Sequence, residues 1–110
     1  MRTKNVKKMG LFDLFKRKNM ESEIKEYLEK GAIVLDVRTQ MEWDEGHSHG
    51  AKHVVLNLIP LKLDEIKALN KPVIAVCKSG GRSGQATQFL TNNGLDVING
   101  GPWQNVDQYL

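Results

Sequence analysis

The sequence predicts an α/β domain in which an open parallel sheet of four or five strands is flanked by helices. Two observations support this prediction. From residue 20 onward, short runs of strand length alternate with helical segments, and these runs are almost continuously apolar. Strands of a parallel sheet are buried on both faces, so they show no alternation of polar and apolar residues. At 110 residues the chain has room for one such domain.

Charge divides the chain into two parts. Residues 1–19 hold seven Lys or Arg side chains and one Asp, whereas residues 20–110 hold nine basic and twelve acidic side chains. We therefore expect a basic, disordered leader over residues 1–19 and a folded domain over residues 20–110. The apolar residues within 11–15 leave membrane contact through the leader as the less favoured alternative. The mildly acidic domain lacks clustered cations, so we expect no nucleic-acid partner.

The first elements of the domain follow from periodicity and capping. Residues 21–30 are predicted to be helical, because apolar residues recur there on one face. The apolar residues 32–37 form the first strand. Thr39 and Glu42, three residues apart, predict a capping box at the start of a short helix.

The rest of the domain repeats this alternation of strands and helices. The predicted elements are strands over residues 53–57, 73–76 and 95–98, helices over residues 61–69 and 83–93, and a last helical turn that begins at Gly100-Gly101-Pro102. Proline suits the first position of such a turn.

The only cysteine, Cys77, ends the strand over residues 73–76 and opens a glycine-bearing loop before the next helix. In that position backbone N–H groups converge above the thiol, and the helix N-terminus favours negative charge. Lys78 and Arg82 add two cations. We therefore expect a lowered pKa for Cys77 and a loop that binds an anion. A single thiol suits a reducing compartment, so we predict a cytoplasmic protein.

Other titratable residues have two interpretations each. Asp36 and Arg38 stand at the end of the first strand, where an acid and a base can act in catalysis or tie loops together; we favour the structural role. His47, His49 and His53 indicate a metal only weakly, because no carboxylate at helical spacing completes the set. We expect no metal.

Three segments resemble the signatures of rhodanese-like domains. The N-terminal signature resembles residues 35–39 with Glu42-Trp43 and Gly46-His47, the active-site loop resembles residues 77–83, and the C-terminal signature resembles Asn99-Gly100-Gly101 with Trp103. The resemblance extends from about residue 21 to residue 110. Among the single-domain members, the sequence resembles sulfurtransferases of the phage-shock-protein E and GlpE-like type.

The resemblance implies an enzyme, a sulfurtransferase of the thiosulfate type that carries a sulfane sulfur as a persulfide on Cys77. Asp36, Arg38 and His47 match framework positions around the site. The loop residues that match sulfur- and anion-binding positions are Lys78, Ser79, Gly80, Gly81, Arg82 and Ser83. The implied partners are a small anionic sulfur donor and a thiol, cyanide or protein acceptor, and no cofactor is expected.

Two alternatives stay open. A cysteine phosphatase or arsenate reductase needs a loop one residue longer than the four residues that separate Cys77 from Arg82. A non-catalytic interaction module is the second alternative, although such modules commonly lack the cysteine. Ser48-His49 and the longer segment at residues 53–60 depart from the family pattern, which concerns the local loop rather than the chemistry.

Overall fold

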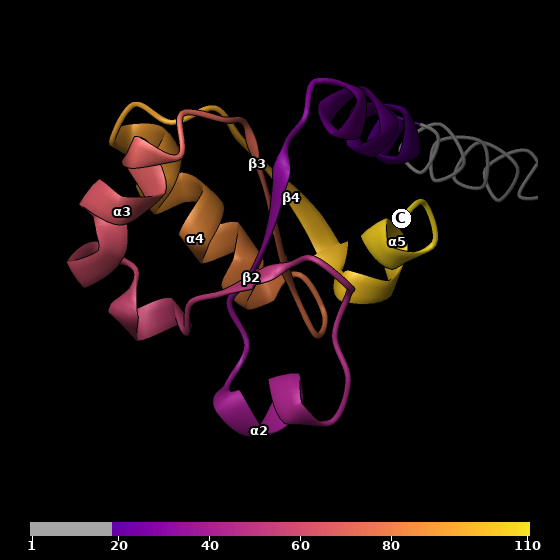
Figure 1. The fold of residues 1–110 in the computed structure, drawn as a ribbon, viewed down its shortest axis with the longest axis horizontal. Coiled ribbons are helices and arrows are strands. Elements are labelled where there is room, and N and C mark those ends of the chain that lie inside the picture. The colour runs from indigo at the N-terminus through magenta and orange to yellow at the C-terminus, as the bar shows by residue number, and fades with distance from the viewer. Residues whose placement is uncertain (1–18) are drawn as a thin grey trace, which may run out of the picture.

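The computed structural model describes residues 19–110, which form a four-stranded parallel sheet with helices on both faces (Figure 1). The strand order is β2-β1-β3-β4, with β1 at Ile33–Asp36, β2 at Lys52–His53, β3 at Val73–Cys77 and β4 at Val97–Pro102. The predicted parallel α/β sheet is confirmed, with four strands in the described part of the chain. Apart from Asn19, the leader expected over residues 1–19 lies outside the described residues.

Helices connect the strands and cover both faces of the sheet. They comprise a helix over residues 19–29, α2 (Gln40–Asp44), α3 (Leu63–Ala68), α4 (Gly81–Asn92) and α5 (Trp103–Asp107), with 3-10 turns η1 (Leu56–Leu58) and η2 (Pro60–Lys62). Figure 1 shows α3 and α4 on one face, and the first helix and α5 on the other. None of the helices formed by residues 19–110 has both the length and the apolar character needed to cross a bilayer.

The core lies on both faces of the central strands. All five residues of β3 are buried, and alternate residues pack into different clusters. Ala75 packs in the cluster that contains Leu90 of α4, whereas Ile74 packs in the cluster that contains Val106 of α5. Burial on both faces therefore explains the continuous apolar run. Cys77 is the last residue of β3, so it lies at the carboxyl edge of the sheet.

Two predicted strands have wrong boundaries. The strand expected over residues 53–57 is reduced to β2, because β1 pairs with it no further than Asp36 opposite His53 and the chain then turns into η1. The fourth strand, expected over residues 95–98, begins at Val97 and continues through Pro102. The last helical turn is confirmed as α5, but it begins after Pro102 rather than within residues 100–102.

A β-bulge explains how β4 accommodates two consecutive glycines. The register between β3 and β4 shifts between Ala75 and Val76 of β3. Gly100 lies at this irregularity, and a Cβ there would approach a methyl carbon of Ile74 to 2.7 Å, closer than real side chains pack. The extra residue changes the course of the strand next to Asn99, which reaches the loop after β3.

Candidate active site

Cys77 lies at the end of β3 and is fully buried under the loop that leads into α4. Gly80 makes the turn possible, because its φ of +105° is a conformation that residues with a Cβ rarely adopt. Its N–H donates to Cys77 Sγ at 2.9 Å, and the N–H of Ser83 lies 3.4 Å from Sγ. The helix begins at Gly81, ahead of the predicted start at residue 83, so the two donors are its N-cap, Gly80, and Ser83 in its first turn.

Hydrogen bonds stabilise the ionised form of Cys77. Burial by itself raises the pKa of the thiol, but the Ser83 hydroxyl and the backbone N–H groups of Ser83, Gly80 and Ser79 together lower it below the ordinary value of 9.0. A thiolate is the nucleophilic form of cysteine. The arrangement therefore favours a reactive sulfur, which is surrounded by uncharged hydrogen-bond donors: backbone N–H groups and the Ser83 hydroxyl.

The Ser83 hydroxyl connects the sulfur to β4. Its Oγ lies 3.2 Å from Cys77 Sγ and donates to Asn99 Oδ1 at 2.7 Å. The Asn99 amide donates in turn to the Gly80 carbonyl at 3.0 Å, and its Oδ1 also accepts from the Gly101 N–H at 2.9 Å. Asn99 thus ties Gly80 and Ser83 of the active-site loop to the bulged strand.

Arg82 is bound by a carboxylate of α2. Its Nη1 and Nη2 donate to Glu42 Oε1 and Oε2 at 2.7 and 2.9 Å, a bidentate pair. These bonds, helped by the N–H of Thr39, hold the pKa of Glu42 well below its ordinary value. The predicted capping box between Thr39 and Glu42 is present, and it orients the same carboxylate.

This pairing corrects the predicted electrostatics of the thiol. The direction of the shift in the pKa of Cys77 agrees with the prediction, but the hydrogen bonds of the loop, rather than two cations, make the largest contributions that lower it. The charge of Arg82 is compensated by Glu42, and Lys78 is exposed on the loop, as are Ser79 and Gly81.

Asp36 and Arg38 form a buried ion pair beside the loop. Arg38 is 5% exposed, and its Nε and Nη2 donate to the Asp36 carboxylate at distances between 2.7 and 3.0 Å. The same guanidinium donates to the carbonyls of Glu42 and Gly46 and lies 5.0 Å from the centre of the Trp103 ring. The pair therefore fixes the end of β1 to the segment that presents Glu42.

Two of the three histidines, His47 and His53, lie against Trp43 rather than around a metal-binding centre. His47 and His53 stack on this indole with ring centroids at 3.5 and 4.6 Å. Because a carbonyl only accepts, His47 Nδ1 donates to the Trp43 carbonyl and His53 Nε2 donates to the Arg38 carbonyl. Within residues 19–110, no three His, Cys, Asp or Glu side chains are placed to share a metal ion.

Two residues that contact the active-site loop, Glu42 and Asn99, are not predicted from the sequence as site residues. Both are distant in sequence from their partners: Glu42 lies 40 residues before Arg82, and Asn99 lies 16 residues after Ser83. A polar residue at the end of the fourth strand was the available signal for Asn99. The capping box with Thr39 is a sufficient reason for a glutamate at position 42, so the sequence gives no sign of its ion pair with Arg82.

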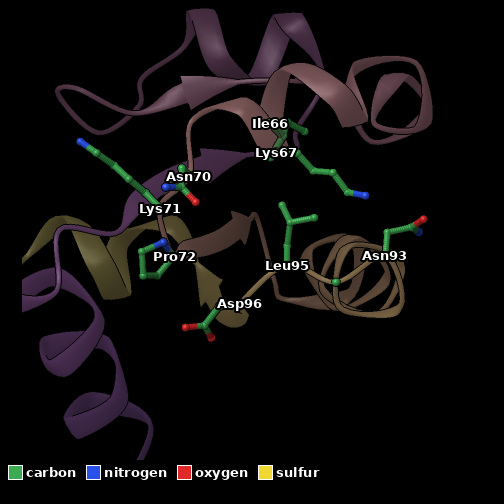
Figure 2. A pocket seen from close by; sticks show the side chains of 9 residues that line it. Ile66, Lys67, Asn70, Lys71, Pro72, Asn93, Leu95 and Asp96 are labelled. Carbon is green, nitrogen blue, oxygen red and sulfur yellow. The ribbon is translucent and has the colours of Figure 1, made fainter.

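A separate hollow of about 580 Å³ lies at the opposite, amino edge of the sheet (Figure 2). Pro72 and Asp96, which precede β3 and β4, line it together with Lys67, Lys71 and Leu95. Cys77 is at the other end of β3. This hollow is therefore not the site of the thiol.

Comparisons with known proteins show which proteins this chain is similar to. The sequence model described as "Rhodanese-like domain" matches residues 20–101. Over 67 residues, 61% of this chain, the sequence is 37% identical to the uncharacterised protein YqhL of Bacillus subtilis. Over 73 residues, 64% of this chain, it is 39% identical to the thiosulfate sulfurtransferase GlpE of Pseudomonas fluorescens. The matched segments span 52% and 63% of those two relatives.

A solved structure shows a similar fold. The crystal structure of SSP1007 from Staphylococcus saprophyticus superposes with a TM-score of 0.64 at 32% identity, and the match covers 76% of this chain and 88% of that protein.

Proposed function

This chain belongs to the rhodanese-like domain family, and on this premise we propose that it is a sulfurtransferase that carries a sulfane sulfur on Cys77. One observation supports the proposal above all: the buried Sγ receives the N–H groups of Gly80 and Ser83 at the carboxyl end of a parallel strand. Ligands of open α/β sheets bind at this edge. Convergent N–H groups stabilise negative charge on sulfur before and after transfer.

In the first half-reaction the Cys77 thiolate attacks the outer sulfur of a donor such as thiosulfate. A bond forms between Sγ and the outer sulfur, the bond from that sulfur to the sulfonate breaks, and sulfite leaves with the electron pair. The outer sulfur of the persulfide then carries the negative charge inside the loop. The exposed ammonium of Lys78 is suited to attract a dianionic donor to this loop.

In the second half-reaction an acceptor takes the outer sulfur. A thiolate, cyanide or a protein thiol attacks it, and the electron pair of the broken S–S bond returns to Cys77 Sγ. The two steps give ping-pong kinetics. This chemistry needs no metal or organic cofactor, and it suits the cytoplasm, where thiols are kept reduced.

The loop argues against phosphate or arsenate as the substrate. Four residues separate Cys77 from Arg82, and both guanidinium nitrogens that would bind a tetrahedral oxyanion are held by Glu42. A non-catalytic module would not need a thiol with a lowered pKa. A sulfurtransferase gains mass with thiosulfate, whereas each of the two alternatives predicts no such gain.

Intact mass spectrometry after brief exposure to thiosulfate tests the proposal. We expect a gain of one sulfur atom that is reversed by cyanide and is absent in Cys77→Ser. Turnover of thiosulfate and cyanide should fall to background in the same variant while its circular dichroism is retained. An unchanged mass with thiosulfate would overturn the proposal, and hydrolysis of aryl phosphates by the parent protein would replace it with a phosphatase.

A further inference from the structure

The Ser83 hydroxyl has one hydrogen and two neighbours that can accept it. Asn99 Oδ1 lies 2.7 Å from Oγ, and Cys77 Sγ lies 3.2 Å from it. Ser83 is fully buried, so solvent does not supply a third partner. When Cys77 is a neutral thiol, its S–H can donate to Oγ while the hydroxyl donates to Asn99, and all three groups are satisfied. When Cys77 is a thiolate, it can only accept.

The orientation of the Asn99 amide is fixed by contacts on both sides. Its Nδ2 donates to the Gly80 carbonyl, and its Oδ1 accepts from the Gly101 N–H. Turning the amide over would place donor against donor at Gly101 and acceptor against acceptor at Gly80. The carbonyl oxygen therefore faces Ser83 permanently, and the Gly101 N–H keeps this oxygen satisfied when the hydroxyl hydrogen turns away.

We propose that Asn99 is a positioning residue that competes with Cys77 for the hydroxyl hydrogen of Ser83, so that this hydrogen moves to Sγ when charge appears on the sulfur and returns to Asn99 when the charge leaves. Asn99 acts on the sulfur only through Ser83. The two residues together adjust how readily the thiol ionises, beside the fixed backbone N–H groups of the loop. This inference deepens the proposed function, on which its catalytic meaning rests.

The charged groups around the loop do not duplicate this role. Lys78 is exposed, Arg82 is paired with Glu42 of α2, and Arg38 is paired with Asp36 at the end of β1. From β4, the uncharged Asn99 is the side chain that reaches Ser83. Fixed charges therefore stay in place during the reaction, whereas the hydroxyl can follow the charge on the sulfur.

During sulfur transfer the charge on Sγ changes twice. It is present on the attacking thiolate, moves to the outer sulfur in the persulfide, and returns to Sγ when an acceptor removes that sulfur. A hydroxyl held by Asn99 is already within reach of Sγ at each of these steps. No backbone movement is needed, because rotation about the Cβ–Oγ bond of Ser83 is sufficient.

The rate of alkylation of Cys77 against pH tests the competition without any sulfur donor. Ser83→Ala removes the hydrogen and should raise the pKa of Cys77 by about one unit or more. Asn99→Ala removes the competing acceptor and should lower this pKa while Ser83 is present. In the Ser83→Ala background, the Asn99→Ala change should have no further effect. Asn105→Ala is the control, since its amide bonds the Gly100 carbonyl nearby and should leave the pKa unchanged.

An equal shift from Asn99→Ala with and without Ser83 would overturn the proposal, because Asn99 would then act through the placement of the loop. A second measurement needs no variant of Asn99. In the parent protein the side-chain carbonyl carbon of Asn99 should titrate by NMR with the midpoint of Cys77, and Ser83→Ala should abolish the titration. An Asn99 signal that does not titrate would also refute the competition. If these results hold and no sulfur is transferred from thiosulfate, the proposed function fails while the competition stands.

Discussion

The two edges of the sheet differ in how their polar groups are arranged. At the amino edge an open hollow of about 580 Å³ is lined by exposed lysines and by Leu95 (Figure 2). At the carboxyl edge, N–H groups and a hydroxyl converge on one buried sulfur, and the nearby charges of Arg82 and Arg38 are compensated by carboxylates. The comparison teaches that convergent donors, rather than open space, identify a site for a single anionic atom.

The largest effect on stability is expected from Asp36→Asn. The change leaves the buried Arg38 without a counter-charge, and breaking such a pair typically costs about 3–5 kcal/mol of unfolding free energy. Asp96→Asn at the amino edge, where the carboxylate is exposed, should cost less than about 1 kcal/mol. Denaturant titration of both variants measures the difference. Equal losses of unfolding free energy would mean that the buried ion pair at the carboxyl edge contributes no more to stability than the exposed carboxylate of Asp96.

The largest effect on activity short of removing the thiol is expected from Gly80→Ala. A side chain is strained at φ +105°, and relief of the strain would turn the N–H away from Sγ, so transfer should fall about 10²-fold. Gly94 is the matched control, since its φ is +89° and it lies at the amino edge. Gly94→Ala should lose similar stability, about 1–2 kcal/mol, and keep full activity. A parallel loss of activity in both variants would show that backbone strain, and not the lost donor, is responsible.

Glu42→Gln should have a smaller effect, which depends on pH. The folded protein holds the pKa of Glu42 below its ordinary value of 4.5, so the ion pair with Arg82 stabilises the fold above that pH and is lost as the pH falls toward the lower folded value. Near neutral pH the variant should lose about 1 kcal/mol of unfolding free energy, and its unfolding free energy should fall less steeply as the pH is lowered. Glu65→Gln removes an exposed pair with Lys62 and should leave the profile unchanged. Unfolding free energies between pH 2 and pH 7, at about one-unit intervals, test this.

The smallest effect is expected at Tyr27, which donates a hydrogen bond to Asp96 at the amino edge. This bond, with burial and nearby carboxylates, raises the pKa of Tyr27 from 10.0 to about 12. The protonated phenol therefore stabilises the fold below pH 10.0, and this contribution is lost as the pH rises through about 12. NMR titration should place the pKa of Tyr27 closer to 10.0 in Asp96→Asn, with sulfur transfer unchanged. A fall in sulfur transfer in that variant would mean that a change at the amino edge of the sheet affects the site at the carboxyl edge.

The sequence predicts those features that depend on neighbouring residues. The buried strands, the capping box of Thr39 and Glu42, and the loop from Cys77 to Ser83 are contiguous segments, and each follows from local periodicity or turn chemistry. The contacts of this loop with Glu42 and Asn99 depend on the packing of α2 and β4 around it, which no local pattern encodes.

The error at Gly100-Gly101-Pro102 has a physical reason. Proline suits the first position of a helix, so the sequence predicts that a helical turn begins in this segment. In the structure the missing side chain of Gly100 is what lets β4 pass close to Ile74, and the strand continues. Close approach between two elements has the same sequence signature as a turn.

The shape of the two outer strands also affects self-association. An exposed strand edge is a template on which a second molecule can add a strand, which is a common route to aggregation. On one side of the sheet, β2 is two residues long and includes Lys52; on the other, β4 is interrupted by the bulge and ends at Pro102, which has no N–H to offer. Both outer strands are therefore poor templates for intermolecular pairing. The bulge that brings Asn99 to the active-site loop thus also makes the outer edge of β4 less suited to pairing with a second molecule.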